Sequence, residues 1–296
     1  VAALLALEAV ERYPYTWQAE LALAEVVRDY RLVWQYDRNI ILLGAPFPSP
    51  DGTRFLIPFN DGRLQVWDLE TYEQLLEVQA YEGKAGNFHI ALWSPSGDRI
   101  LTRSGAEIPR IWDATTGDLL TELRAHGGLN VAWSPVGDQV VTWASEREDT
   151  AIVWDARTGE VILSLPGQKG IVKWAGFSPD GLSVATSLGE IYDVETGELL
   201  TKLPGYEGLL TNRRQLQMMW SPDGQSLVAS IGGNIAIWDS TSGEEILHIS
   251  TGSEDEKRAW WSPTGDRLLT IAPGTRAPFN IWDANTGEWL CTSVSS

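Results

Sequence analysis

The stretch VAWSPVGDQVVTWASEREDTAIVWDARTGEVILSLP, residues 131–166, decides the fold. It holds four short runs rich in Val, Ile and Leu, a composition typical of β-strands. We expect strands at 130–134, 139–144, 150–154 and 161–165. Two markers separate these runs, Trp-Ser-Pro-x-Gly-Asp at 133–138 and Trp-Asp-x-x-Thr-Gly at 154–159. The stretch therefore predicts one antiparallel four-stranded sheet.

Both markers have the chemistry of chain reversals. Pro135 fixes φ and Gly137 allows a positive φ, so the chain can turn between the first two strands. Asp155 can accept backbone N–H groups at the second turn, where Gly159 supplies a flexible corner. One such sheet cannot cover both of its faces, so copies of it must stack.

Both markers recur in phase along the chain. Spacings of 40 to 46 residues separate the aromatic residues of the first marker, which are Phe47, Trp93, Trp133, Phe177, Trp220 and Trp261. The second marker contains the pairs Trp67-Asp68, Trp112-Asp113, Trp154-Asp155, Tyr192-Asp193, Trp238-Asp239 and Trp282-Asp283. A Gly closes the second turn in five copies, and Tyr72 replaces it in the first copy. We interpret these paired residues as structural repeat positions.

A period near 40–45 residues with closing Trp-Asp pairs resembles the WD40 repeat family over residues 31–296. The resemblance implies an all-β fold, a β-propeller of four-stranded antiparallel blades with six recognisable blades. The family's Gly-His pair is almost absent here. Ala125-His126 comes nearest to it, and Tyr81 stands near another equivalent place. We therefore expect the family's buried His–Asp network to be missing from most blades, with Trp packing in its place.

The number of outer strands leaves the ring size open. Outer strands are expected at 75–78, 119–123, 161–165, 199–203, 245–249 and 289–294, and a seventh candidate, 31–35, precedes the first repeat. One interpretation is a seven-bladed ring that this chain truncates. The other is a closed six-bladed ring with a redundant strand.

Residues 1–30 form a second predicted region. They are rich in Ala, Leu and Glu with helical spacing, and Pro14 divides them, which predicts an α-helical hairpin. The hairpin is interpreted as the end of an upstream region or as a cap on the first sheet. This junction also resembles the one before WD40 arrays in bacterial signal-transduction NTPases.

Charge and cysteine content limit the partners. The formal net charge is −18, which disfavours nucleic acid and anionic membrane surfaces. Cys291 is the only cysteine, so neither an intrachain disulfide nor a cysteine-based metal site is expected. No signal peptide or membrane span is recognised near the first residue. These features predict a cytoplasmic protein with a protein or peptide partner.

No catalytic pattern stands out. A P-loop, a Gly-x-Ser-x-Gly motif and paired histidines are all absent from the sequence. We therefore expect no enzyme activity, cofactor or metal, and favour a binding platform, the sensor or scaffold part of a larger signalling ATPase. A propeller enzyme with a site in the central channel, as a hydrolase or quinoprotein-like oxidoreductase, and a structural spacer are the alternatives.

The resemblance also places candidate binding residues. In WD40-like propellers one face is formed by loops between blades and between the second and third strands. Residues three before each first-marker aromatic should approach this rim, and Trp143 is a candidate for an exposed residue beside it. For Trp143 and Trp174, ordinary packing between blades is the alternative. The candidate protein-binding residues are Ile90, Asn130, Trp143, Glu146, Arg147, Glu148, Trp174, Arg213, Arg214, Gln217 and Arg258.

Overall fold

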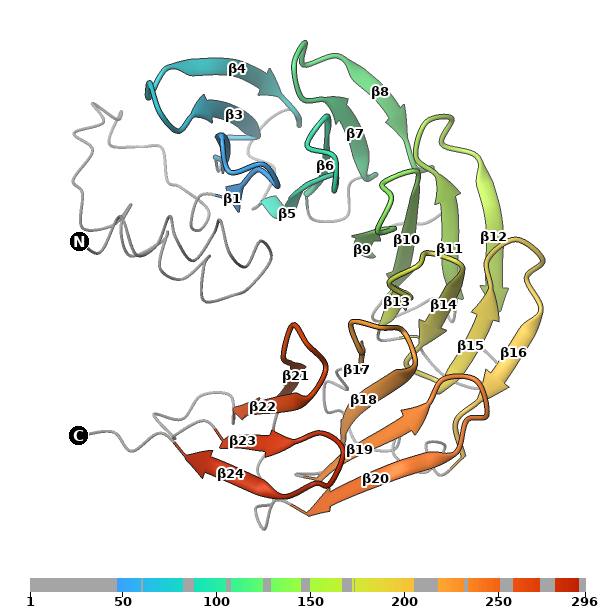
Figure 1. Ribbon diagram of the computed structural model, residues 1–296. Helices are drawn as coiled ribbons and strands as arrows, with labels where there is room; N and C mark the ends of the chain where they lie inside the picture. The colour runs from blue at the N-terminus through green and yellow to red at the C-terminus, as the bar shows by residue number, and fades with distance from the viewer. Residues whose placement is uncertain are drawn as a thin grey trace. The chain divides into compact units, whose positions relative to one another are not determined.

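The computed structural model describes strands and turns from Phe47 to Thr292. The described residues are 47–59, 61–81, 88–104, 108–124, 129–144, 150–166, 172, 174–204, 218–231, 234–250, 258–271 and 280–292. The predicted helical hairpin and the candidate strand 31–35 lie outside them. The strands of these segments form four-stranded sheets (Figure 1).

Six antiparallel sheets hold the described strands, and each follows the chain order of its own four strands. Sheet 1 comprises β1 (Phe47–Pro48), β2 (Arg54–Pro58), β3 (Arg63–Asp68) and β4 (Gln74–Gln79). Sheet 2 comprises β5 (Phe88–Trp93), β6 (Arg99–Ser104), β7 (Arg110–Asp113) and β8 (Leu119–Glu122). Sheet 3 comprises β9 (Leu129–Trp133), β10 (Gln139–Ala144), β11 (Thr150–Asp155) and β12 (Val161–Pro166).

The other three sheets repeat this pattern. Sheet 4 comprises β13 (Ala175–Phe177), β14 (Ser183–Thr186), β15 (Glu190–Asp193) and β16 (Leu199–Lys202). Sheet 5 comprises β17 (Met218–Trp220), β18 (Ser226–Ile231), β19 (Asn234–Asp239) and β20 (Glu245–Ser250). Sheet 6 comprises β21 (Arg258–Trp261), β22 (Arg267–Ile271), β23 (Asn280–Asp283) and β24 (Trp289–Thr292). The predicted all-β class and four-stranded antiparallel blades are confirmed.

The first turn of each sheet is held by its serine. The hydroxyl oxygen of Ser94 accepts the backbone N–H of Arg99 at 3.0 Å, and Ser221 does the same for Ser226 at 2.9 Å. Gly137 has φ +82°, so the predicted positive φ of this turn is confirmed. All six sheets share the serine contact, which explains why Ser-Pro recurs with the glycine.

The register corrects one expectation about the first copy. Phe47 pairs with Leu56 and Pro48 with Phe55, whereas Trp93 of sheet 2 pairs with Ile100. Counted from the shared serine, Pro48 therefore occupies the aromatic position, and Phe47 lies one residue before it. The sequence pattern misplaced the aromatic residue because the turn, and not the ring, sets the register.

The chain divides into two compact units. The first comprises Val1–Gly128, Val136–Asp138 and Ala156–Glu160, and it contains sheets 1 and 2. A core cluster between these sheets joins Leu56, Val66 and Val78 to Trp93 and Trp112. The core of this unit therefore lies between two sheet faces.

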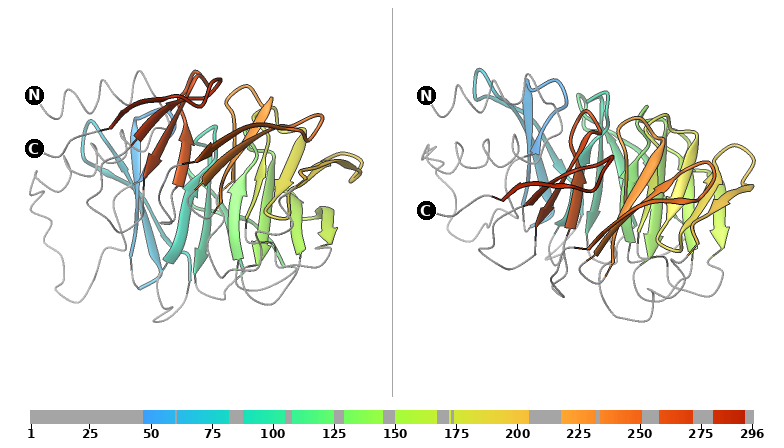
Figure 2. Two further views of the ribbon diagram at one scale, coloured as in Figure 1. Left: turned by 90° about the horizontal axis from the view of Figure 1, so that it is seen from below. Right: turned by 60° about the horizontal axis from the view of Figure 1, so that its bottom comes forward.

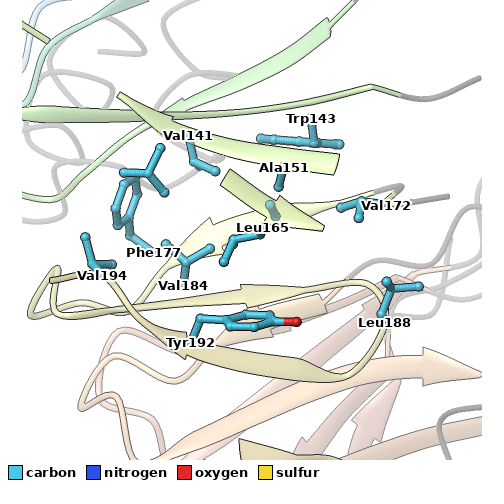
Figure 3. Packing of buried hydrophobic residues seen from close by; sticks show 12 residues of the cluster. Val141, Trp143, Ala151, Leu165, Val172, Phe177, Val184, Leu188, Tyr192 and Val194 are labelled. Carbon is cyan, nitrogen blue, oxygen red and sulfur yellow. The ribbon is translucent and has the colours of Figure 1, made fainter. Parts of the chain in front are cut away.

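The second unit contains sheets 3 to 6, which follow one another face to face within it (Figure 2). Figure 3 shows one such interface, where Val141 and Leu165 of sheet 3 meet Phe177, Val184 and Tyr192 of sheet 4. Similar clusters join sheets 4 and 5 and sheets 5 and 6. Sheets 4 and 5 are therefore covered on both faces, as expected for sheets that must stack.

Candidate protein-binding site

The candidate residues divide into those that the structure describes and those that it does not. Ile90, Asn130, Trp143 and Trp174 are described, and Arg258 opens β21. The candidates outside the described residues are Glu146, Arg147, Glu148, Arg213, Arg214 and Gln217.

The described candidates occupy equivalent places in their sheets. Asn130 pairs with Trp143 across β9 and β10, and Ile90 pairs with Arg103 across β5 and β6. Each pair joins the beginning of a first strand to the end of a second strand. The same end of each of these two sheets therefore carries candidate residues.

Arg103 is a further candidate in sheet 2, and the sequence argument did not name it. Its side chain is half-buried, and its Nε makes no hydrogen bond. Within the described part of the chain no carboxylate pairs with it. Burial lowers the pKa of the Arg103 guanidinium, while Tyr81 opposes this shift. An arginine is costly to desolvate without a partner, so this group is suited to binding an acceptor from outside.

A sequence signal for Arg103 existed. Its position, directly after a buried threonine, carries Trp143 in sheet 3 and Ser187 in sheet 4. An arginine at a position that carries tryptophan in sheet 3 and serine in sheet 4 is a departure from the repeat. Neither of the two sequence markers includes this position.

Trp143 is not exposed, contrary to the rim interpretation. Its side chain is 8% exposed and belongs to the cluster between sheets 3 and 4. Figure 3 shows it at one end of that cluster with Val172 and Leu188. The sequence leaves two interpretations open for Trp143, an exposed rim residue and packing between blades, and the structure supports packing because the following sheet covers the ring. Packing between sheets is therefore the role that the structure shows for this residue.

Trp174 is half-buried and contacts two core clusters, those joining sheets 3 and 4 and sheets 4 and 5. Its ring lies over Gly176, where a β-carbon would come within 2.6 Å of the Trp174 Cζ2 atom. The Gly176 carbonyl in turn accepts the Trp220 Nε1 hydrogen at 3.1 Å. Trp174 is thus fixed by packing while part of its side chain remains open to solvent.

The closing tryptophans are held by a buried threonine in three sheets. Trp112 Nε1 donates to Thr102 Oγ1 at 2.8 Å. The equivalent bonds from Trp154 to Thr142 and from Trp282 to Thr270 measure 2.9 and 3.0 Å. A buried indole N–H needs such an acceptor. In these three sheets the closing tryptophan therefore serves the architecture.

Tyr81 extends this network in sheet 2. Its hydroxyl donates to the Thr102 carbonyl at 2.8 Å and lies 3.1 Å from Thr102 Oγ1. Tyr81 is 2% exposed and stands near the place of the family's histidine. The sequence predicted that Trp packing would replace the buried hydrogen-bond network of the family. In sheet 2 that prediction is incomplete, because Tyr81 makes buried hydrogen bonds there.

The turn aspartates act as local caps. Asp113 Oδ1 accepts the backbone N–H groups of Thr115 and Thr116, both at 2.8 Å, and these bonds lower the pKa of Asp113. Asp283 accepts the Asn285 and Thr286 N–H groups at 2.9 Å, again with a lowered pKa. A carboxylate already satisfied in this way is unsuited to acid–base work.

The described residues offer no centre for metal chemistry. No group of three or more His, Cys, Asp or Glu side chains in the described ranges could hold a metal ion. In the same part of the chain, no helix is long and apolar enough to cross a membrane.

The four-stranded antiparallel sheets, repeated with closing Trp-Asp pairs, have the architecture of β-propeller blades of the WD40 type. No protein-family model matches the chain. Similar curated proteins are themselves WD40-repeat proteins. Protein FIZZY-RELATED 2 of Arabidopsis thaliana is 26% identical over 163 residues, covering 54% of this chain and 30% of the relative.

Two other relatives extend the comparison. Apoptotic protease-activating factor 1 of Rattus norvegicus is 26% identical over 204 residues, which is 66% of this chain and 16% of that protein. Eukaryotic translation initiation factor 3 subunit I of Drosophila sechellia is 27% identical over 175 residues, which is 54% of this chain and 52% of that protein. The matched regions thus span about half or less of each of these relatives.

Proposed function

We propose that this chain is a non-catalytic protein-binding platform. The observation that carries the proposal is Arg103, a half-buried cation without a described partner at the strand end where the candidate residues lie. Arginine and tryptophan are the residue types that dominate binding energy at protein interfaces. Arg103 is the residue of this kind in the first unit and Trp174 the one in the second, and each is proposed as a binding residue of its own unit.

The guanidinium of Arg103 indicates the chemistry of the partner at this point. In a protein of net charge −18, an acidic partner meets general repulsion and needs a specific cation. Arg103 can hold a carboxylate with two parallel hydrogen bonds. The partner at this point is therefore a protein or peptide that presents an acidic side chain, with Ile90 as the apolar neighbour across the strands.

The larger context is part of the proposal. A match covering 16% of apoptotic protease-activating factor 1 supports the idea that such a repeat region serves as one part of a longer protein. We infer the sensor or scaffold part of a larger signalling ATPase, acting in the cytoplasm. The N-terminal junction and its resemblance to bacterial signal-transduction NTPases support the same context.

Affinity capture with the intact chain tests the proposal. Proteins retained by the wild type are quantified against an Arg103→Ala variant and a Trp174→Ala variant. Arg99→Ala is the matched control because Arg99 begins the same strand β6, away from the Arg103 end. We expect at least one retained protein to fall about tenfold with Arg103→Ala, in line with the cost of a hot-spot residue. A retained set unchanged by both variants would contradict the proposed site.

Turnover assays separate this proposal from the enzyme alternative. Purified chain is tested for hydrolase and dehydrogenase activity. Robust turnover that copurifies with the chain through every chromatographic step would contradict a non-catalytic role.

A further inference from the structure

The outer strand of every described sheet contains a β-bulge, which is an extra residue without a partner on the neighbouring strand. In sheet 3, Trp154 pairs with Val161 and Val153 pairs with Leu163, so Ile162 is the extra residue. The other five sheets shift register at the same place. The six bulge residues are Leu75, Leu120, Ile162, Leu200, Ile246 and Leu290.

All six bulge residues are leucine or isoleucine, and the exposed fraction of each lies between 41% and 54%. A residue that has no partner across the strands needs no apolar side chain to hold the sheet, and edge strands commonly carry charged side chains instead. Single exposed apolar residues are ordinary, whereas apolar residues that gather on one surface mark an interaction site. Whether the bulge residues form such a surface depends on how consecutive outer strands meet.

Each outer strand of sheets 1 to 5 meets a glycine corner, which is the glycine of the next sheet's second turn packed on the residue after the bulge. At Gly197 a β-carbon would lie 2.6 Å from Leu163 Cδ1, and at Gly287 one would lie 3.1 Å from Leu247 Cδ1. Cys291 holds the position of Leu247 in sheet 6. The five contacts are Leu76–Gly117, Thr121–Gly159, Leu163–Gly197, Thr201–Gly243 and Leu247–Gly287. Residues next to a corner are thus brought together from two sheets.

An exposed acidic residue follows every corner glycine. In the second unit, Ile162 directly precedes Leu163, and Glu198 directly follows Gly197. The corner therefore brings the bulge residue Ile162 of sheet 3 together with Glu198 of sheet 4. The second unit contains three such junctions, and their residues are called here the bulge stripe: Ile162, Glu198, Leu200, Glu244, Ile246 and Glu288.

The carboxylates of the bulge stripe are available to a partner. No described lysine, arginine or histidine pairs with Glu198, Glu244 or Glu288. Val161 and Leu199, which precede the bulge residues of sheets 3 and 4, are each 49% exposed and widen the apolar part of the surface. Figure 1 shows the outer strands β12, β16 and β20 at the edges of their sheets. The stripe thus offers aliphatic groups and negative charges in alternation.

We propose that the bulge stripe is a docking surface for a basic amphipathic segment of another protein. Aliphatic side chains of that segment would lie against the bulge residues, and its lysine or arginine side chains would pair with the three glutamates. Charge complementarity selects this partner, because cations gain from the carboxylates whereas a second copy of this chain, at net charge −18, is repelled. The inference goes beyond the proposed function and is independent of the acidic partner at Arg103.

A synthetic peptide of leucine and lysine in an amphipathic helical pattern is the probe, and the fluorescence anisotropy of its labelled form measures binding to the intact chain. A second peptide carries glutamate in place of every lysine. The stripe variant combines Ile162→Ser with Leu200→Ser. The matched control combines Val136→Ser with Leu182→Ser, because these residues are 69% and 66% exposed at the first turns of the same two sheets. Neither variant changes the net charge, so general attraction of a basic peptide to an acidic protein is the same in all three proteins.

We expect the stripe variant to bind the lysine peptide about tenfold more weakly than the wild type, in line with the loss of hot-spot contacts, and the control to bind it as the wild type does. Urea midpoints should be equal for the three proteins, because the substituted side chains are exposed. Equal affinities of the stripe variant and the control would overturn the proposal. Equal binding of the lysine and glutamate peptides to the wild type would overturn it as well.

Removal of a single charge gives a second test. Glu244→Gln acts in the middle of the bulge stripe, whereas Glu70→Gln removes the same charge from the second turn of sheet 1. We expect Glu244→Gln alone to weaken binding of the lysine peptide, by about threefold, as for loss of an exposed ion pair. Equal losses in both variants would show a general electrostatic effect and overturn the proposal. Dimers by light scattering that disappear in the stripe variant would identify a second copy as the occupant and also overturn it.

Discussion

The corner residue of the second turn differs between sheets 1 and 2, and so do its surroundings. Gly117 of sheet 2 has φ +78°, and a β-carbon there would lie 2.8 Å from Leu76 Cδ1. Tyr72 of sheet 1 has φ +58°, and its side chain is 55% exposed. The backbone turn is thus the same in both sheets, whereas only the glycine corner is pressed against a preceding outer strand. Packing between sheets, more than backbone geometry, therefore selects the glycine.

Placing the bulky residue at the packed corner should have the largest effect. Gly117→Tyr adds left-handed strain of about 1–2 kcal/mol and overpacking against Leu76 of about 1–3 kcal/mol. We expect a loss of roughly 2–5 kcal/mol in the free energy of unfolding, measured by urea denaturation. A loss below about 1 kcal/mol would show that the corner is not tightly packed.

The buried threonine tests the second difference between these sheets. Thr102→Val leaves the Trp112 indole N–H without its acceptor and removes one partner of the Tyr81 hydroxyl, which should cost about 1–3 kcal/mol. Thr158→Val is the control, because Thr158 is a threonine in a turn instead of the core. The comparison uses urea midpoints and the near-ultraviolet circular dichroism of the tryptophans. Equal midpoints for the two variants would argue against a structural network at Thr102.

The reverse exchange at the open corner should have a small effect of opposite sign. Tyr72→Gly relieves left-handed strain, but glycine also raises the entropy of the unfolded chain. We expect a gain of up to about 1 kcal/mol in stability, measured alongside Gly117→Tyr. A clear loss would mean that the Tyr72 side chain makes contacts that the corner comparison does not include.

The smallest expected effect concerns pH. The turn aspartates, including Asp113, Asp239 and Asp283, have lowered pKa values chiefly because backbone N–H groups donate to them. A carboxyl group with a lower pKa in the folded state stabilises the fold above its unfolded pKa of about 3.9, and this contribution is lost as the pH falls through the folded value. Stability should therefore decrease below about pH 4.

Replacement of these aspartates isolates their contribution. A variant with asparagine at Asp113, Asp239 and Asp283 should lose less of its thermal stability than the wild type between pH 4 and pH 3. Glu70→Gln, at an exposed position in the turn of sheet 1, is the control. Identical pH profiles for all three proteins would contradict the capping role.

Much of the fold could be predicted from the sequence because the turns carry it. The two markers located all six sheets, and the predicted strands of residues 131–166 agree with β9 to β12 within a residue or two. The register at Phe47 differs from the sequence prediction. The prediction aligned the aromatic ring of Phe47 with Trp93, whereas the serine of the turn sets the register. Strand register next to a turn can therefore be predicted from the sequence when the copies are aligned on the serine of the turn.

The candidate site was less predictable because it depends on neighbouring sheets. Trp143 was a candidate for an exposed residue, but sheet 4 covers it. Arg103 was overlooked because its lack of a described partner appears only when the surrounding side chains are placed. The Thr102–Tyr81 contact joins residues 21 positions apart, across a boundary between two repeats. Such contacts are set by how neighbouring sheets stack. The sequence period predicts that the sheets stack, but not which side chains meet.

The central claim is that the outer strands of sheets 1 to 5 are each covered by the glycine corner of the next sheet. Thiol reactivity measures this most directly when a single cysteine is moved along equivalent positions. Leu163→Cys and Leu247→Cys, each combined with Cys291→Ser, should react at least tenfold more slowly with a maleimide than Cys291 does in the unaltered chain. Equal rates at all three positions would contradict the claim.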